Sequence, residues 1–169
     1  MKFEHEVLLA EAAPGAQLSA PQLWAALVLR ANDPGQFMPA LQACHIDARG
    51  CNEAGFETLS RRLDFGSFEV RDEATLIAPH TLQMETLAGP SWPASRFAIS
   101  ILVNEEGQLL GLRFCYASDE PIDNELGEVT HALRCQAYQA ADRDMVKRIQ
   151  LLAAEGALDI VSKAAKLST

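Results

Sequence analysis

Arg61 and Asp72 are the two side chains whose types and spacing point most directly to chemistry in this sequence. They lie on either side of Gly66-Ser67, where glycine supplies the positive φ of the first position in a two-residue hairpin turn. Counting outward from that turn places Arg61 opposite Asp72. Cross-strand partners share one side of a sheet, and neighbours on this side, such as Val70, are apolar. We therefore predict a partly buried ion pair that lines a cavity.

Two roles are open for this pair. In the structural role it fixes the register of the hairpin, or it lies near a strand end and reaches solvent. In the functional role Arg61 anchors a carboxylate, phenolate or carbonyl group of a bound ligand, and Asp72 orients that ligand. If the site is buried, leaving one partner without the other costs about 3–5 kcal/mol.

His5 and Tyr116 are two further polar residues on apolar faces. His5 lies between Phe3 and Val7, where it is either a satisfied core residue or an acid or base near neutral pH. Tyr116 continues the apolar face of a later segment, and we expect it to place a phenol at the cavity mouth. If the protein is an enzyme, we expect His5, Asp72 or Tyr116 to act as acid or base.

The histidines, cysteines and glycines form no motif for a metal or a nucleotide. The four histidines lack the His-x-x-x-His spacing, and the four cysteines form no Cys-x-x-Cys pair. The sequence contains no Gly-x-Gly-x-x-Gly, no phosphate-binding loop and no Gly-x-Ser-x-Gly elbow. We therefore predict no metal, no cofactor and four free thiols.

The formal net charge of −9 over 169 residues narrows the classes of partner. This charge disfavours nucleic acids and anionic membrane surfaces, which proteins bind through Lys and Arg. No stretch approaches the roughly 20 apolar residues of a membrane span, and the first residues lack a secretory signal. We expect a cytoplasmic protein that binds no nucleic acid and does not insert into a membrane.

The elements that must position these side chains begin with a strand at residues 2–10, which alternates between apolar and polar side chains. A helix follows, because Ser19 and Gln22 can form a capping box and Asn32-Asp33-Pro34-Gly35 is a stop signal. Residues 36–42 are expected to form a second short helix.

Residues 43–118 show a pattern of strands and turns with no helix between them, which is typical of antiparallel pairing. The expected strands are 43–51, 55–65, 68–77, 80–88, 95–104 and 108–117. We expect this sheet to curve around the helix that follows it.

A long helix is expected from Pro121 and Asp123 to about Glu155, with Gly156 as its stop. The middle of its inward stripe consists of alanines, which indicates either a close approach of the sheet or room for a ligand. The predicted stripe comprises Leu126, Val129, Leu133, Ala137, Ala140, Ala141, Met145, Ile149 and Leu152. Residues 1–156 then form a single domain, followed by a C-terminal tail at 157–169.

Several short motifs accompany this order of elements. They are Leu18-Ser19, Gln22-Leu23-Trp24, Leu27-Val28-Leu29-Arg30-Ala31, Pro34, Phe37-Met38-Pro39, Cys44, Arg49-Gly50, Arg62-Leu63-Asp64-Phe65-Gly66, Val70-Arg71-Asp72, Ala137-Tyr138 and Ala141-Asp142. Together they resemble the START-related SRPBCC superfamily, and more closely its AtaL-like family, over residue 1 to about residue 156.

This resemblance implies an α+β helix-grip fold. A seven-stranded antiparallel sheet would curve around a long C-terminal helix, with two short helices after the first strand. Members of the superfamily bind lipids, polyketides, hormones or other apolar molecules, and some act as cyclases or ring-modifying enzymes. The AtaL-like family has no catalytic motif that transfers to this sequence residue by residue.

We expect the protein to bind a small apolar or amphipathic molecule in a cavity between the sheet and the last helix. One alternative is a cavity enzyme, such as a cyclase or dehydratase that acts on a polyketide-like or aromatic substrate. Another is a protein-interaction module with a filled core. Both a monomer and a homodimer fit the sequence. The cavity candidates are His5, Arg61, Val70, Asp72, Ile99, Ile101, Leu112, Phe114, Tyr116, Leu133 and Ala137.

Overall fold

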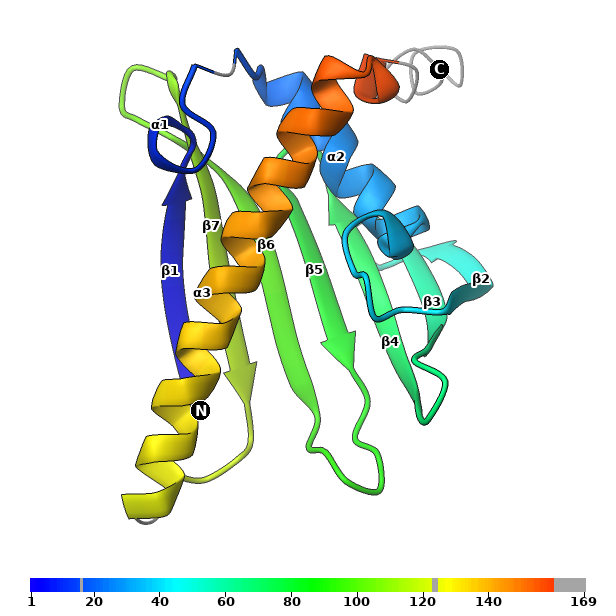
Figure 1. Cartoon of the computed structure of the whole chain (residues 1–169). Coiled ribbons are helices and arrows are strands. Elements are labelled where there is room, and N and C mark those ends of the chain that lie inside the picture. The colour runs from blue at the N-terminus through cyan, green and yellow to red at the C-terminus, as the bar shows by residue number, and fades with distance from the viewer. Residues whose placement is uncertain (16, 123–124, 160–169) are drawn as a thin grey trace.

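A seven-stranded antiparallel sheet and the long helix α3 (Glu125–Ala154) dominate the fold (Figure 1). The computed structural model describes residues 1–15, 17–122 and 125–159. Helix α3 runs diagonally across one face of the sheet, and α2 (Ala20–Asn32) covers the same face beside the C-terminal end of α3 (Figure 1). The predicted α+β architecture is confirmed.

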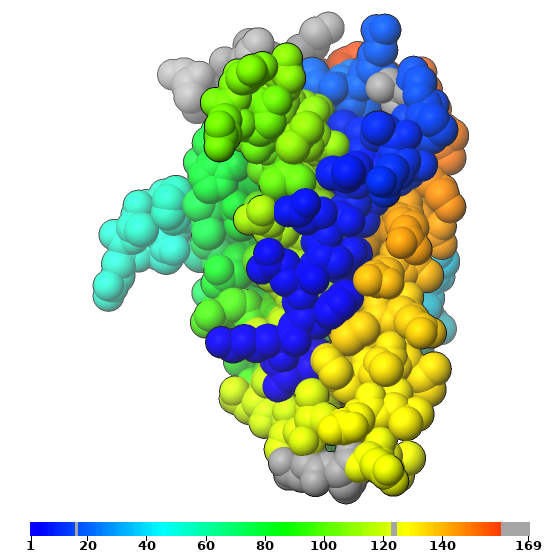
Figure 2. Space-filling model, turned by 90° about the vertical axis from the view of Figure 1, so that its left-hand side faces the viewer, coloured from blue at the N-terminus to red at the C-terminus, as the bar shows by residue number. Residues whose placement is uncertain are grey.

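The strand order is β1-β7-β6-β5-β4-β3-β2, so six consecutive strands form hairpins and β1 joins the sheet beside β7. All neighbouring strands are antiparallel. Figure 2 shows β1, in blue, packed along α3, in yellow and orange. The strands are β1 (Lys2–Leu8), β2 (Ala43–Cys51), β3 (Glu57–Asp64), β4 (Glu69–Ile77), β5 (Thr81–Thr86), β6 (Ser95–Val103) and β7 (Leu109–Ser118).

Two short segments differ from the prediction. The first strand ends at Leu8, because Leu9–Ala12 form a helical turn, α1, from residues that favour helices. Residues 36–42 do not form the predicted second helix, and only Pro34–Gln36 form a short 3-10 helix, η1. Pro39 explains the difference, because a proline inside a helix removes a backbone hydrogen bond.

The start of α2 has the predicted capping box. The backbone N–H of Gln22 donates to Ser19 Oγ at 3.3 Å, and the N–H of Ser19 donates to Gln22 Oε1 at 2.9 Å. The capped helix turns Leu23 and Leu27 fully into the core. The core therefore lies between α2, the C-terminal half of α3 and the sheet.

The β3–β4 hairpin has the predicted register. Arg61 lies opposite Asp72, and Leu63 lies opposite Val70. Gly66 has a φ of 85°, which glycine adopts without the steric strain of a side chain. The turn therefore places the two charged residues on the same side of the sheet, as expected.

The inward stripe predicted for α3 is correct from Met145 onward and wrong before it. Ile149 and Leu152 are buried. In contrast, Leu126, Val129 and Leu133 are 75%, 58% and 61% exposed. In a regular helix about 160° of rotation separates Leu133 from Ile149, so these two residues cannot face the sheet together.

The three alanines in the middle of the predicted stripe, Ala137, Ala140 and Ala141, are also exposed. The inner side of this part of the helix carries Tyr138 and the buried Asp142 instead. Polar and aromatic side chains therefore face the sheet in the middle of α3.

Parts of two predictions fall outside the described residues. Asp123, the predicted start of α3, is one of them, and residues 160–169 of the predicted tail are the others. Within the described part of that tail, Leu158 is fully buried in the core.

Candidate functional site

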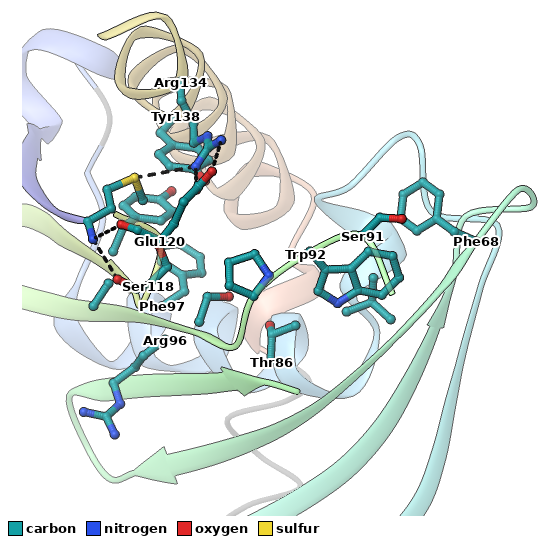
Figure 3. Close-up of a pocket in the computed structure, with 16 residues that line it drawn as sticks. Phe68, Thr86, Ser91, Trp92, Arg96, Phe97, Ser118, Glu120, Arg134 and Tyr138 are labelled. Atoms are coloured by element: carbon teal, nitrogen blue, oxygen red, sulfur yellow. Dashed lines mark hydrogen bonds and ion pairs between the residues drawn. The ribbon is translucent and has the colours of Figure 1, made fainter. Parts of the chain in front are cut away.

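A cavity of about 460 Å³ lies between the sheet and the N-terminal half of α3. Strands β4 to β7, helix α3 and the loop between β5 and β6 all contribute to its lining. Aromatic rings form two of its sides (Figure 3): Phe97 and Tyr138 lie on one side, and Phe68 and Trp92 lie on the other. The cavity therefore combines aromatic walls with polar and charged side chains.

The first aromatic side is a continuous stack. The rings of Tyr138 and Tyr116 are 4.1 Å apart with an interplanar angle of 3°. The rings of Tyr116 and Phe97 are 4.3 Å apart with an angle of 16°. Each ring comes from a different element, α3, β7 and β6, so the stack fixes the helix against the sheet at the edge of the cavity.

Asp142 lies directly behind this stack and is 5% exposed. The hydroxyl of Tyr116 donates to both of its carboxylate oxygens, at 2.9 and 2.8 Å. His5 Nε2 lies 2.6 Å from Asp142 Oδ2. The Tyr116 hydroxyl thus links the cavity wall to a buried carboxylate and a histidine.

Burial raises the pKa values of Asp142 and Tyr116. Removal from water raises the pKa of the Asp142 carboxyl, although its hydrogen bonds with His5 and Tyr116 lower it. Burial also raises the pKa of the Tyr116 phenol, and the negative charge of Asp142 adds to that effect. Tyr116 therefore remains a protonated hydrogen-bond donor at neutral pH.

Arg61 and Asp72 form the predicted ion pair, and it is more deeply buried than expected. They are 3% and 6% exposed, with Nε to Oδ1 at 2.9 Å and Nη2 to Oδ2 at 2.5 Å. Nη1 donates to the backbone oxygen of Ala31 at 2.7 Å, at the C-terminal end of α2. All three guanidinium nitrogens already donate to the protein, which favours the structural role over a ligand anchor.

Arg30 is a second arginine that faces inward, and the sequence did not predict this orientation. Its guanidinium carbon lies 5.9 Å from the centre of the Phe97 ring. Its Nε is buried, and within the described residues it has no hydrogen-bond partner. Burial and the positive charge of Arg61 lower the pKa of Arg30 to about 10. Arg30 is therefore still a cation at neutral pH, with donor capacity that the protein leaves unused.

Three charged residues lie in the lining itself. Arg134 of α3 forms an ion pair with Glu120, which lowers the pKa of that carboxyl (Figure 3). Arg96 points away from the cavity in Figure 3 and pairs with Glu85 at 2.8 Å. Arg134, one helical turn before Tyr138 on α3, is thus the lining arginine available to a ligand in the cavity.

The structure separates the predicted cavity residues into four groups. Val70 and Tyr116 line the cavity. Ile99, Leu112 and Phe114 are fully buried core residues, and Ile101 packs against them. His5, Arg61 and Asp72 belong to the two buried polar groups described above. Leu133 and Ala137 lie on the exposed face of α3, so the prediction that they face inward was wrong.

The sequence contained one signal that could have located Asp142. Ile149 and Met145 define the buried side of α3, and steps of three or four residues toward the N-terminus reach Asp142 and Tyr138. Arg30 had no comparable signal, because arginine at the end of a helix is ordinarily exposed.

The part of the chain that the structure describes contains neither a cluster of metal ligands nor a helix that could span a membrane. It contains no group of three or more His, Cys, Asp or Glu side chains placed to hold a metal ion. None of its helices combines the length and apolar character needed to cross a membrane. All four cysteines are free.

Solved structures with the same fold share little sequence with this chain. The Zhui aromatase/cyclase from Streptomyces sp. R1128 is 12% identical, with a TM-score of 0.61 over 90% of this chain and 95% of that one. Ara h 8.0201 is 14% identical, with a TM-score of 0.55 over 88% and 97%. A START superfamily protein from Mycobacterium smegmatis is 14% identical, with a TM-score of 0.51 over 88% and 98%. At this level of identity the likeness establishes the helix-grip fold alone.

None of the curated proteins matches the chain. A model of the family AtaL, described as acetylaranotin biosynthesis cluster protein L, matches residues 9–156. The match runs from α1 to the end of α3 and includes six of the seven strands. The chain therefore belongs to the AtaL family, and its fold is the START-like helix grip.

Proposed function

We propose that the protein binds a small amphipathic molecule with an aromatic or other flat apolar body in the cavity between the sheet and α3. The observation that carries this proposal is the 460 Å³ volume walled by aromatic rings from α3, β6, β7 and the β5–β6 loop. Binding sites for small molecules typically measure about 300–1,000 Å³ and combine apolar walls with a few polar groups. A ring stack on one side and the tilted rings of Phe68 and Trp92 on the other suit a planar ligand better than a flexible chain.

The polar groups at the cavity favour a ligand with an acidic or carbonyl oxygen. Arg134 lies in the lining, and Arg30 lies behind Phe97 with an unpaired Nε. A carboxylate, phenolate or carbonyl group would supply an acceptor for Arg30 Nε and would compete with Glu120 for Arg134. The Arg61 side chain is 1% exposed and lies outside the lining, whereas the Arg134 side chain is 32% exposed within it, so we assign the anchoring role to Arg134, with Arg30 behind Phe97 adding positive charge.

Native mass spectrometry and thermal unfolding with a panel of aromatic acids, aromatic polyketides, fatty acids and sterols test the proposal. A ligand at about 100 times its Kd should stabilise the protein by about 2.7 kcal/mol. Thr86→Trp should abolish this stabilisation, because Thr86 lines the cavity and a tryptophan there would fill it. Val103→Trp is the matched control, because Val103 is 47% exposed and lies outside the lining.

Two results would count against the binding proposal. One is a panel that leaves the melting temperature and the native mass unchanged. The other is stabilisation of the Thr86→Trp variant equal to that of the wild type, which would place the ligand elsewhere.

The hydrogen bonds of Tyr116 favour a second candidate function, proton-transfer catalysis on the bound molecule. When Asp142 is protonated, which its raised pKa favours, it can donate to the Tyr116 oxygen, and the single phenol proton is then free to be donated to a substrate oxygen. Tyr116→Phe keeps the ring stack and removes only the hydroxyl. If the protein only binds its ligand, this variant should retain most of the affinity. If it is an enzyme, the variant should bind the substrate and fail to convert it.

A further inference from the structure

The outer face of α3 carries a continuous apolar stripe. Leu126, Val129 and Leu133 are 75%, 58% and 61% exposed, and Ala137 and Ala140 are also exposed. Their spacing of three, four, four and three residues keeps all five on one side of the helix. The stripe points away from the sheet, so it belongs to neither the core nor the cavity. Large apolar side chains in a contiguous exposed row indicate an interaction surface.

We propose that this stripe binds the same stripe of a second copy of the chain, with the two α3 helices antiparallel and related by a two-fold axis at Leu133. The spacing on either side of Leu133 is palindromic. In a two-fold interface each contact occurs twice, so a self-complementary surface is required. A palindromic row on an antiparallel helix pair meets that requirement directly.

Side-chain size supports the antiparallel arrangement. It places Leu126 of each copy against Ala140 of the other, and Val129 against Ala137. Large residues then pack against small ones along the row, and the two Leu133 side chains meet at the centre. Alternation of large and small residues allows two surfaces to interdigitate without gaps.

Charge supports the same arrangement. Glu125 precedes the stripe and Arg143 follows it, and both side chains are exposed. Neither forms an ion pair with any residue that the structure describes. The antiparallel arrangement brings Glu125 of one copy near Arg143 of the other at both ends of the interface. A parallel pair would instead bring Glu125 next to Glu125, which is unfavourable.

The contact is modest in size. One pair of helices over four turns buries less than the roughly 800 Å² per partner of a standard interface. The net charge of −9 on each copy also opposes association. We therefore expect a reversible dimer with a micromolar Kd.

Sedimentation equilibrium from about 1 to about 200 µM protein tests the dimer by mass action. The mass of the wild type should rise with concentration from 18.4 kDa toward twice that value. Leu133→Glu should hold the mass at that of the monomer, because the two carboxylates would meet at the axis. Leu151→Glu is the matched control, since Leu151 is 56% exposed on the same side of α3 but lies beyond the stripe.

A charge exchange tests the orientation. Glu125→Arg alone should weaken the dimer, and the double change Glu125→Arg with Arg143→Glu should restore it. A wild type that remains monomeric at about 200 µM, or equal effects of the two leucine changes, would overturn the proposal. Binding of the monomer to neutral phosphatidylcholine vesicles, lost on Leu133→Glu, would also overturn it and would assign the stripe to a membrane. Circular dichroism shows whether each variant keeps its fold.

Discussion

Asp142 connects three parts of the chain that are distant in sequence. It lies on α3, accepts hydrogen bonds from Tyr116 of β7, and contacts His5 of β1, which is 137 residues away. Such a carboxylate costs free energy to bury unless it is paired and hydrogen-bonded. The three residues therefore hold one another in place, and substitution of any one of them should weaken the contacts between the other two and the rest of the fold.

The raised pKa of Asp142 predicts how stability depends on pH. Because burial raises this pKa above the ordinary value of 3.8, the folded protein binds the proton more tightly than the unfolded chain does. The resulting stabilisation is fully present below pH 3.8 and is lost as the pH rises through the folded pKa. Asn at this position cannot titrate, so Asp142→Asn should lack this dependence.

Urea unfolding of the wild type and of Asp142→Asn, at several values between about pH 3.5 and about pH 7, measures the effect. The free energy of unfolding of the wild type, relative to the variant, should decrease as the pH rises. Asp144→Asn is the control, because the Asp144 side chain is 75% exposed on the same helix. If the difference in unfolding free energy between the wild type and Asp142→Asn does not change with pH, the raised pKa of Asp142 is contradicted.

The buried ion pair predicts a large loss of stability when it is broken. Arg61→Met leaves the Asp72 carboxylate buried without its partner and removes the donor to the end of α2. The free energy of unfolding should fall by about 3–5 kcal/mol. Arg113→Met should cost about 1 kcal/mol or less, because the side chains of the Arg113–Glu6 pair are 43% and 42% exposed. A similar loss in both variants would show that burial of the Arg61 pair is not the cause.

At the scale of the elements, the junction of β1 and β7 depends on one glycine. A Cβ at Gly111 would lie 2.1 Å from the backbone oxygen of Val7. Neither strand can yield without separating from the other, so Gly111→Ala should destabilise the protein by about 1–3 kcal/mol. Hydrogen exchange should also increase specifically in β1.

Gly50→Ala on β2 provides the matched comparison. Its Cβ would meet only Thr58 Oγ1 at 3.6 Å, an ordinary contact. This variant should change stability by less than about 1 kcal/mol. Equal destabilisation by both alanines would mean that the loss of glycine in a strand matters, and not the close approach of β1.

The elements also show which features could be predicted from the sequence. The Ser19 capping box and the Gly66-Ser67 hairpin were predicted correctly, because both depend on residues close together in the chain. The phase of α3 was wrong in its first half, because apolar side chains were assumed to face the sheet. Arg30 was not predicted to face inward, because a charged residue is ordinarily assumed to be exposed. Its neighbour Phe97 lies on β6, far away in the sequence, so no local pattern marks Arg30 as buried.

At the scale of the whole molecule, the two edge strands of the sheet, β1 and β2, are protected from pairing with another sheet in different ways. The β1 edge packs along α3 (Figure 2), while β2 has a register shift between Ile46 and Ala48. Asp47, at that shift, pairs with Arg62, and both side chains are substantially exposed. A bulge and charged residues on an edge strand oppose pairing with another sheet. We therefore expect association through α3 to leave the β2 edge unused.

The position of β1 next to β7 also determines when the protein can fold during its synthesis. Glu6 and Arg113, which pair across this junction, are 107 positions apart. At about 5–20 residues per second, β1 leaves the ribosome roughly 5–20 seconds before its partner strand exists. During that interval the apolar side of β1 has no native surface to cover it, and closing so long a loop slows the final step. The nascent chain should therefore depend on chaperones until β7 and α3 emerge, and the last native contacts to form should be those that complete the His5–Asp142 group.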